Sequence, residues 1–247
     1  MFNNLKRINL IYHLKTTSST MTDSYDIINN IQPLPESFVV IADEQIGGVG
    51  RNNNQWVSNH GGLWITYCFK TEGASHQTAL LVGVSLHQTL LKYIPFVRER
   101  LFIKWPNDII LNKKKLAGIL VQAKHGYICI GVGVNTNNER FSLDGLQQPV
   151  CISEFLPYVI SNSAILKSFL NSIDATYKNF LNNGFSKCRE YIAENLYLRG
   201  EFVVLKTDSL EIRGLCKGVG HDGAIIIEDV SGELKSYYSG SLFKSGE

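Results

Sequence analysis

The chain lacks the paired cysteines that mark a disulfide framework or a zinc site. Its five cysteines are an odd number, and no CxxC pair occurs among its 247 residues. They stand singly, at Cys68, Cys129, Cys151, Cys188 and Cys216. This spacing argues against a disulfide-stapled secreted domain and favours a reducing, cytoplasmic environment.

Long apolar runs and a strong charge imbalance are also missing. No apolar stretch approaches the roughly 20 residues needed to span a bilayer. The basic start of the chain is interrupted by Asn9 and His13, and no small-residue cleavage site follows, so it does not read as a signal peptide. The formal net charge of +2 is too small for a general nucleic-acid binder, so we expect any anion binding to be local.

Several widespread catalytic motifs are absent from the sequence as well. There is no HExxH motif and no Ser-His-Asp order, and the glycines at 47–50 are not followed by the Gly-Lys-Ser/Thr of a nucleotide P-loop. His60 and His87 are isolated histidines, for which structural roles are favoured. We therefore expect no metal site built from protein ligands.

The patterns that are present predict a globular protein of mixed helices and strands. A 44% hydrophobic and 19% charged composition suits one large domain, or one large and one small domain. After a hydroxyl-rich junction at Ser19 and Thr20, a helix carries Ile27, Ile28 and Ile31. Strands are predicted at 8–14, 38–42, 61–69, 101–103, 109–111 and 126–137, and further helices at 77–93, 164–181 and 186–196.

The pattern of the sequence changes near Arg199 and Gly200, from predicted helices to closely spaced short strands. From Glu201 onward, four short strand candidates are separated by turns at 221–223 and 231–232. Closely spaced strands in about fifty residues suggest a small barrel, too small to be very stable alone, that docks on the preceding domain. We expect domains at residues 1–198 and 199–247.

A glycine-rich loop runs from Gly47 to Trp64, between two predicted strands. Gly47, Gly48 and Gly50 permit close approach of a ligand to backbone N–H groups, and Arg51 offers a planar fork suited to a carboxylate or phosphate. These features favour an anion site. The glycines by themselves, however, favour an ordinary connecting loop slightly over an anion-binding loop.

A second cluster, KWPND, lies between two predicted strands. Pro106 favours an extended conformation for Trp105, so Lys104, Asn107 and Asp108 should project from a rigid turn.

The polar turn NKKK follows this cluster and joins a hairpin. Lys115 begins the return strand, from which its cation can reach back towards Asp108. For Lys113 and Lys114 the alternative of solvated surface lysines is favoured.

The third cluster is GVGVN, from Gly131 to Asn135. Alternate glycines on a strand remove side chains from one face and leave a slot for a flat ligand, at whose edge Asn135 both donates and accepts hydrogen bonds. A crowded sheet crossing explains the glycines equally well.

Together, the three clusters could stabilise anions through the cations Arg51, Lys104 and Lys115, with Asp108 as candidate acid or base. That combination suits transfer at a phosphate or carboxylate.

Taken in order, these motifs resemble those of the biotin-protein ligase family, in its monofunctional type. The resemblance rests on SSTM at 18–21, IADEQxxGxGRxxxxW at 41–56, SNHGGLW, KWPNDIILxxxKLAGIL and GVGVN. It covers most of residues 8–140 and continues more loosely through the C-terminal strands. KWPND followed by KLAGIL is its most specific part.

The resemblance implies an α+β fold: a mixed sheet with flanking helices in a catalytic domain like that of class II aminoacyl-tRNA synthetases, then an SH3-like barrel. It implies that biotin and ATP form biotinyl-5'-AMP, with Mg2+ carried on the ATP phosphates, and that the biotinyl group passes to a lysine of a biotin carboxyl carrier domain. That carrier belongs to acetyl-CoA carboxylase or a related carboxylase. A monomer or weak homodimer is expected.

The resemblance also assigns roles to individual residues. For biotin binding these are Ser19, Thr20, Met21, Gln45, Gly48, Gly50, Arg51, Lys115, Gly118, Gly131 and Gly133. For ATP binding they are Arg51, Trp56, Lys104, Asn107, Lys115 and Asn135. For catalysis they are Lys115, Arg51 and Asp108, with Lys115 as the first choice for the essential cation and Asp108 either orienting it or assisting the incoming lysine.

The sequence departs from the family pattern in the glycine-rich loop. Val49, Asn52 and Asn54 stand where basic residues are common, and Asn59 where a proline is common. Either the adenylate is held less firmly, or Lys113, Lys114 or the C-terminal barrel compensates for the missing basic residues. Nothing resembling a DNA-binding helix-turn-helix precedes the first strand, so repressor activity and DNA binding are not expected. Two alternatives remain: a lipoate or octanoate ligase of the same fold, and a non-catalytic biotin-binding protein.

Overall fold

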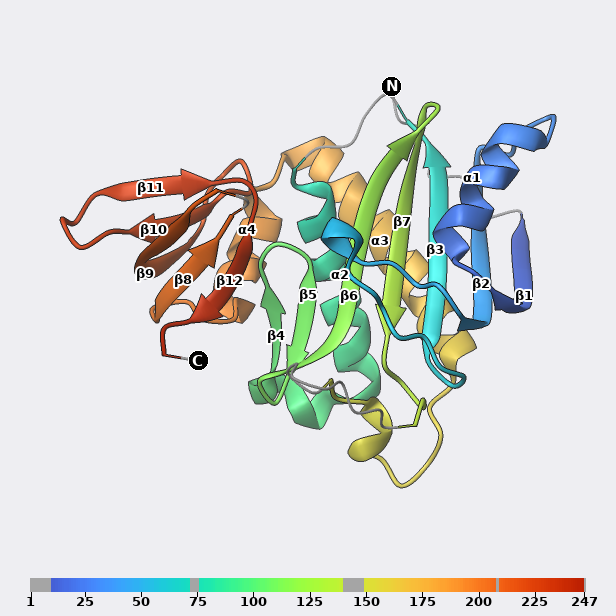
Figure 1. Cartoon of the computed structure of the whole chain (residues 1–247), viewed down its shortest axis with the longest axis horizontal. Coiled ribbons are helices and arrows are strands. Elements are labelled where there is room, and N and C mark those ends of the chain that lie inside the picture. The colour runs from blue at the N-terminus through green and yellow to red at the C-terminus, as the bar shows by residue number, and fades with distance from the viewer. Residues whose placement is uncertain (1–9, 72–75, 140–148, 208, 247) are drawn as a thin grey trace. The chain divides into compact units, whose positions relative to one another are not determined.

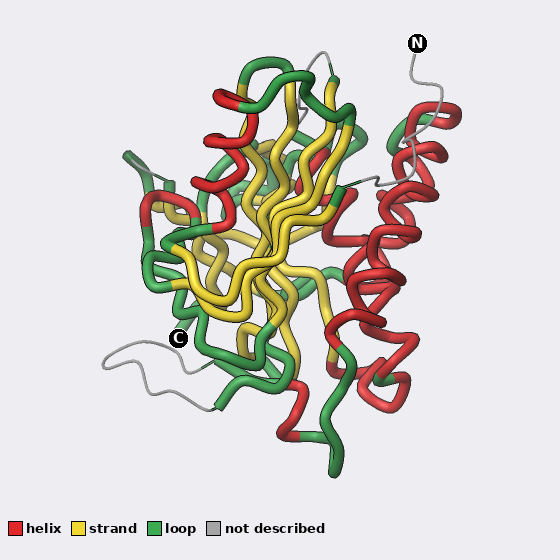
Figure 2. Tube along the Cα trace, turned by 90° about the vertical axis from the view of Figure 1, so that its right-hand side faces the viewer, coloured by secondary structure: helices red, strands yellow, loops and turns green. Residues whose placement is uncertain are grey.

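The computed structural model describes residues 10–71, 76–139, 149–207 and 209–246. The chain forms two compact units, the first made of residues 1–75 and 114–167 and the second of residues 76–113 and 168–247. The course of helices and strands along the chain can be followed in Figure 2. The helices are α1 (Thr20–Asn30), α2 (Thr78–Tyr93), α3 (Asn162–Asn183) and α4 (Ser186–Asn195), with short 3-10 turns η1 (Arg51–Asn53), η2 (Pro95–Arg100) and η3 (Ile152–Glu154).

A parallel strand pair opens the first unit. Strand β1 (Ile11–Thr17) pairs in parallel with β2 (Ser37–Gln45), and α1 supplies the crossover that a parallel connection needs. The predicted strand 8–14 is thus found a few residues later, and its first two residues lie outside the described ones. Ser19 is the N-cap of α1, as the hydroxyl-rich junction predicts, but its side chain makes no capping hydrogen bond.

Three antiparallel strands extend this sheet. Strand β2 pairs with β3 (Leu63–Lys70), β3 with β7 (Tyr127–Val134), and β7 with β6 (Lys114–Lys124), and the strands lie side by side in Figure 1. One parallel and three antiparallel pairings make the sheet of the first unit mixed, which confirms that part of the prediction. The glycine-bearing strand is central, with β3 and β6 on either side.

Helix α1 packs on β2, β3 and β7 through the apolar core of the first unit. This core includes Met21, Ile28, Phe38, Val40, Cys68, Tyr127 and Cys129. Cys68 and Cys129 are far apart in sequence but directly opposite in the β3–β7 register. Both are reduced, and burial raises the pKa of the Cys68 thiol far above its ordinary value, which disfavours its thiolate form.

The second unit contains the KWPND hairpin. Strands β4 (Leu101–Lys104) and β5 (Asp108–Leu111) flank the turn, as predicted. They pair antiparallel, and the register places Lys104 opposite Asp108, which was not predicted. The Trp105–Pro106 peptide is cis. The turn after β5 carries Asn112 and Lys113 at positive φ, which is the geometry of a tight hairpin turn.

Five short strands follow in the second unit. They are β8 (Phe202–Lys206), β9 (Glu211–Val219), β10 (Ile225–Glu228), β11 (Leu234–Tyr237) and β12 (Ser241–Lys244), in the spatial order β11-β10-β9-β8-β12. Four of them match the predicted strands, whereas β12 was not predicted. In the part of the chain that the structure describes, β11 and β12 lie at the two edges of this sheet. Closure of the sheet into a barrel therefore remains a prediction.

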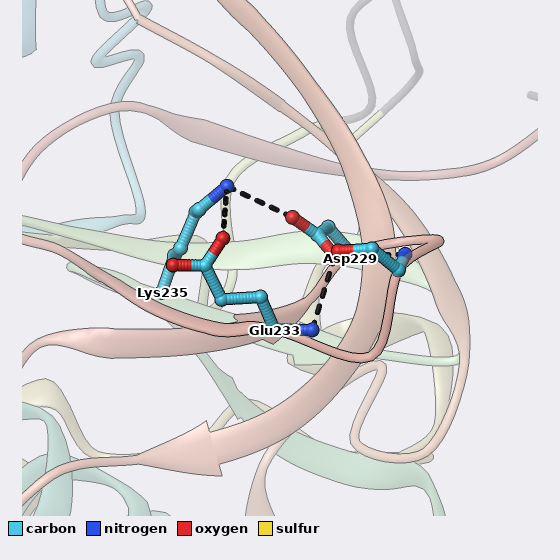
Figure 3. Close-up of polar contacts among 4 residues, drawn as sticks. Asp229, Glu233 and Lys235 are labelled. Atoms are coloured by element: carbon cyan, nitrogen blue, oxygen red, sulfur yellow. Dashed lines mark hydrogen bonds and ion pairs between the residues drawn. The ribbon is translucent and has the colours of Figure 1, made fainter.

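A polar network fixes the turn between β10 and β11 (Figure 3). Asp229 accepts hydrogen bonds from the backbone N–H of Ser231 at 2.9 Å and of Glu233 at 3.1 Å, and Lys235 Nζ lies 2.8 Å from its second oxygen. The bond from Lys235 and those from Ser231 and Glu233 hold the pKa of the Asp229 carboxyl well below its usual range. Because this network is exposed, water screens it and it stabilises the turn only weakly.

His87 is buried in the second unit and serves a structural role, as expected. Its Nδ1 lies 2.8 Å from the Tyr191 hydroxyl and its Nε2 lies 3.0 Å from the Leu101 carbonyl oxygen, so the side chain joins α2 to α4 and β4. Burial lowers the pKa of His87 below its ordinary value. No helix among the described residues has the length and apolar character needed to traverse a bilayer.

Replacing His87 by Gln should make the free energy of unfolding less sensitive to acid. Because the folded-state pKa is lowered, the unfolded chain takes up a proton that the folded one does not as the pH falls below about 6.5. His87 therefore costs stability at acid pH, by at most about 1.4 kcal/mol per pH unit. Urea unfolding between about pH 5 and pH 8 measures the difference. The same acid sensitivity in both proteins would contradict the assignment.

Candidate active site in the first unit

The polar end of the first sheet lies where β1 and β2 finish. Thr17 and Gln45 are register partners at the carboxyl ends of these parallel strands, so α1 begins beside the end of β2. The backbone N–H and the hydroxyl of Thr20 both donate to Gln45 Oε1, at 2.9 Å and 3.1 Å. The structure therefore brings together two predicted biotin-binding residues that are 25 positions apart.

Two further hydroxyl residues extend this contact. Thr66 on β3 donates to the Thr20 hydroxyl at 2.9 Å, and Gln45 Nε2 donates to the Ser58 hydroxyl at 2.8 Å. Ser58 in turn donates to the Trp56 carbonyl oxygen at 3.3 Å. Neither Thr66 nor Ser58 was predicted. The available signal was a single polar residue inside the apolar run of β3, and a serine two positions after the loop tryptophan.

The glycine-rich loop is folded back on itself. Gln45 N–H donates to the Ser58 carbonyl at 3.0 Å, and Trp56 N–H donates to the Gly48 carbonyl at 2.8 Å. A Cβ on Gly48 would lie 2.5 Å from the Trp56 carbonyl oxygen and 2.8 Å from Ser58 Oγ. The close approach of the backbone therefore explains this glycine without a ligand. To this extent the interpretation of the segment as an ordinary connecting loop is correct.

The asparagines of the loop also have a backbone role. Asn52 and Asn53 adopt left-handed conformations, with φ of 55° and 57°. Asparagine tolerates this region better than most residues with a side chain, because its short amide bonds locally. The sequence NNN thus shapes the turn at η1.

The indole of Trp56 occupies the slot expected above the glycine strand. Gly118 and Gly133 are opposite each other on β6 and β7, and added Cβ atoms there would lie 3.0 Å and 2.6 Å from the indole. Lys115 Nζ lies 5.0 Å from the Trp56 ring centroid, within range of a cation–π contact. A Cβ added at the neighbouring Gly131 would lie 3.1 Å from the Met21 sulfur instead. Whether biotin lies on Gly131 and Gly133 stays a prediction.

Asn135 is held rigidly at the end of β7. Its backbone N–H donates to the Leu116 carbonyl and its own carbonyl accepts from Ile152 N–H, both at 3.0 Å. Its side-chain Oδ1 accepts from Asn138 Nδ2 at 3.2 Å. Asn135 is therefore buried with a fixed amide plane.

A groove of about 810 Å³ lies beside these loops in the first unit. Its lining includes the carboxylates of Asp43, Glu44 and Glu139 and the imidazole of His60. His60 belongs to the loop wall and has no catalytic partner among the described residues. Gly61 in the same wall accepts hydrogen bonds from Thr136 and Asn162, which fasten the loop.

The KWPND residues belong to the second unit. The Trp105 indole donates to the Gly223 carbonyl at 3.1 Å, and Lys104 Nζ lies 5.2 Å from the Phe243 ring centroid. Asp108 is half-buried at the start of β5. The joint action of Lys104, Asn107 and Asp108 with residues of the first unit stays a prediction.

Comparison with known proteins tests the resemblance. The Biotin/lipoate A/B protein ligase family matches residues 13–135 of this chain. These residues contain the Thr20–Gln45 pair, the glycine-rich loop, KWPND, Lys115 and GVGVN. The chain belongs to this family.

Relatives of this family member align well beyond residue 135. The bifunctional ligase/repressor BirA of Bacillus subtilis is 26% identical over 94% of this chain and 73% of its own length. The biotin acetyl-CoA-carboxylase ligase of Paracoccus denitrificans is 26% identical over 78% of this chain and 85% of its own. The structure of the Aquifex aeolicus biotin protein ligase in complex with biotin and ATP has a TM-score of 0.85 and 23% identity, covering 96% of this chain and 100% of that one. The last similarity confirms the fold, a mixed α+β architecture.

In this family member, Gly133→Ala should lower the free energy of unfolding by about 1–3 kcal/mol. The added methyl would lie 2.6 Å from Trp56 Nε1, so the indole or the strand must move. Gly131→Ala is the matched control on the same strand, because its tight contact is with the flexible Met21 side chain at 3.1 Å, and the Leu120 carbonyl oxygen lies at an ordinary 3.6 Å. Urea unfolding of the three proteins compares them. Equal losses of unfolding free energy in Gly133→Ala and Gly131→Ala would show that the Trp56 indole is not what requires glycine at position 133.

Proposed function

We propose that this chain attaches biotin to a lysine of a carrier protein in two steps. A biotin carboxylate oxygen attacks the α-phosphorus of ATP, and pyrophosphate leaves. The amine of the carrier lysine then attacks the carbonyl of biotinyl-5'-AMP, an amide forms, and AMP leaves. The polar end of β1 and β2, where Thr20 and Gln45 meet within the family match, carries this proposal. The names of the relatives and the ligands of the Aquifex aeolicus structure support it.

The proposed chemistry needs cations, since a carboxylate and a triphosphate must approach each other. Arg51 and Lys115 are the cationic residues of the first unit that we assign to this task, holding the carboxylate and the α-phosphate. Preorganised charges of this kind stabilise the transition state, and holding both substrates removes the entropic cost of their encounter. Trp56 covers the ligands and Asn135 lies on the adenine side.

The remaining assignments follow the family. Ser19, Thr20 and Gln45 bind the ureido ring, with Met21, Gly48, Gly50, Gly118, Gly131 and Gly133 forming the surrounding wall. Lys104 and Asn107 contribute to ATP binding. Asp108 orients Lys115 or assists the incoming lysine. Mg2+, a hard cation that prefers phosphate oxygens and water, would arrive with ATP.

We also propose the finer architecture. Residues 1–198 form the catalytic domain, related to class II aminoacyl-tRNA synthetases, and residues 199–247 form an SH3-like barrel. The carrier is the biotin carboxyl carrier domain of acetyl-CoA carboxylase or a related carboxylase, a choice supported by the name of the Paracoccus relative. The protein acts as a monomer or weak homodimer without binding DNA.

The experiment that tests this function is a direct comparison of biotin and lipoate, since the family includes ligases for both. Isothermal titration should give tighter binding of biotin, and pyrophosphate exchange into ATP should depend on biotin. Tighter binding of lipoate would identify a lipoate ligase. Tight biotin binding without exchange would identify a non-catalytic biotin-binding protein.

Replacing Lys115 by Ala should reduce adenylate formation by about 10²- to 10³-fold, because a cation that stabilises developing phosphate charge is lost. Lys114→Ala is the control: Lys114 is the exposed neighbour on β6, and its side chain points to the opposite face of the strand. Biotin-dependent pyrophosphate exchange measures the effect, and thermal unfolding checks the fold. Wild-type exchange in Lys115→Ala would remove its assigned role.

A further inference from the structure

Two buried hydroxyl residues, Thr66 and Ser58, belong to a continuous chain of hydrogen bonds through the predicted biotin pocket. The chain runs from Thr66 to Thr20, Gln45 and Ser58, and ends at the Trp56 carbonyl. It connects β3, α1, β2 and the glycine-rich loop. Thr66 is 0% exposed and Ser58 is 1% exposed, and the hydroxyl of each donates to a partner within the chain.

The number of protons available fixes the direction of this chain. Gln45 Oε1 accepts from both the N–H and the hydroxyl of Thr20, so Gln45 Nε2 faces Ser58. A hydroxyl has a single proton to donate. Thr20 has given its proton to Gln45, and it can only accept from Thr66. Ser58 gives its proton to the Trp56 carbonyl, and it can only accept from Gln45.

This direction determines what the pocket can offer to a ligand. The hydroxyl of Thr20 keeps one lone pair, so it acts as an acceptor. The chain uses one N–H of Gln45 and leaves the second as a donor. An acceptor beside a donor complements a cyclic urea, which carries N–H groups next to a carbonyl oxygen. Without Thr66, the Thr20 hydroxyl could turn and donate elsewhere. Without Ser58, only the Thr20 residue would orient the Gln45 amide, so the pattern would be held less firmly.

We propose that Thr66 and Ser58 are positioning residues for biotin recognition: they set Thr20 as acceptor and Gln45 as donor without contacting biotin themselves. The proposal rests on the proposed function, in which Thr20 and Gln45 bind the ureido ring. It adds that the polarity of these two residues is imposed from the buried side of the pocket. Ser58 also ties that polarity to the loop that carries Trp56.

The test uses Thr66→Val, which removes the hydroxyl and keeps the shape. Losing one hydrogen bond of this kind should weaken biotin binding roughly tenfold. Thr66→Ser, which keeps the hydroxyl, should stay close to wild type. Thr89→Val is the matched control: Thr89 is also 0% exposed, and it donates to the Ser85 carbonyl at 2.8 Å within α2 of the second unit.

Two readouts separate positioning from general destabilisation. In the exchange assay, Thr66→Val should raise KM for biotin and leave KM for ATP unchanged, whereas a structural defect would alter both. Desthiobiotin, which keeps the ureido ring and lacks the sulfur, should lose affinity by the same factor as biotin. Ser58→Ala provides a second, independent variant that should also raise KM for biotin.

The outcomes distinguish this proposal from the function on which it rests. Suppose that the wild-type protein binds biotin and that Thr66→Val and Ser58→Ala bind it within about twofold of wild type. The positioning role is then refuted and the proposed function stands, because one lost hydrogen bond would weaken binding roughly tenfold. An unequal loss for desthiobiotin would also refute it. If the wild-type protein binds no biotin, the proposed function fails, and the assignment fails with it.

Discussion

The contact between Thr20 and Gln45 is the interaction on which the rest of the site depends. It exists because β1 and β2 are parallel, so the chain leaves both strands at the same edge of the sheet. Helix α1 starts from one of these ends, and the glycine-rich loop starts from the other. Joining the two by hydrogen bonds to one amide fixes the first turn of the helix and the base of the loop together.

Crowding is the second constraint on the site. Glycine is needed at 48, 61 and 133 because carbonyl groups or the Trp56 indole lie where a Cβ would be. At each of these three positions the neighbouring atoms are so close that an added methyl group forces one of them to move. The glycine-rich character of the motifs therefore reflects how closely the backbone segments pass, in addition to any ligand.

Much of the fold could be predicted because its signals are local. Apolar runs, the Pro106 turn and the polar turn before Lys115 indicate strands and hairpins within a few residues. Strand β12 (Ser241–Lys244) escaped because its sequence, SLFK, shows neither a long apolar run nor an alternation of polar and apolar residues. The opposition of Cys68 and Cys129 escaped for another reason: register across strands distant in sequence depends on tertiary pairing.

The candidate site was predictable only as a set of motifs. Lys115, Arg51 and Gln45 stand out by residue type within such motifs, whereas Thr66 looks like one hydroxyl in an ordinary strand. The role that we propose for Thr66 follows from which hydroxyl groups donate and which accept, and this is known only once Thr20 and Gln45 are placed beside it. The filled slot at Gly133 was unpredictable for the same reason, since a pair of spaced glycines does not reveal which side chain lies over them.

The stacking of Trp56 has an optical consequence. Its indole meets that of Trp64 edge to face, with centroids 6.5 Å apart and planes 75° apart, while a lysine cation sits over its face. Indole emission responds to both a neighbouring ring and a nearby charge. The protein therefore carries an intrinsic fluorophore in its candidate site, on the loop that also bonds to the end of β2.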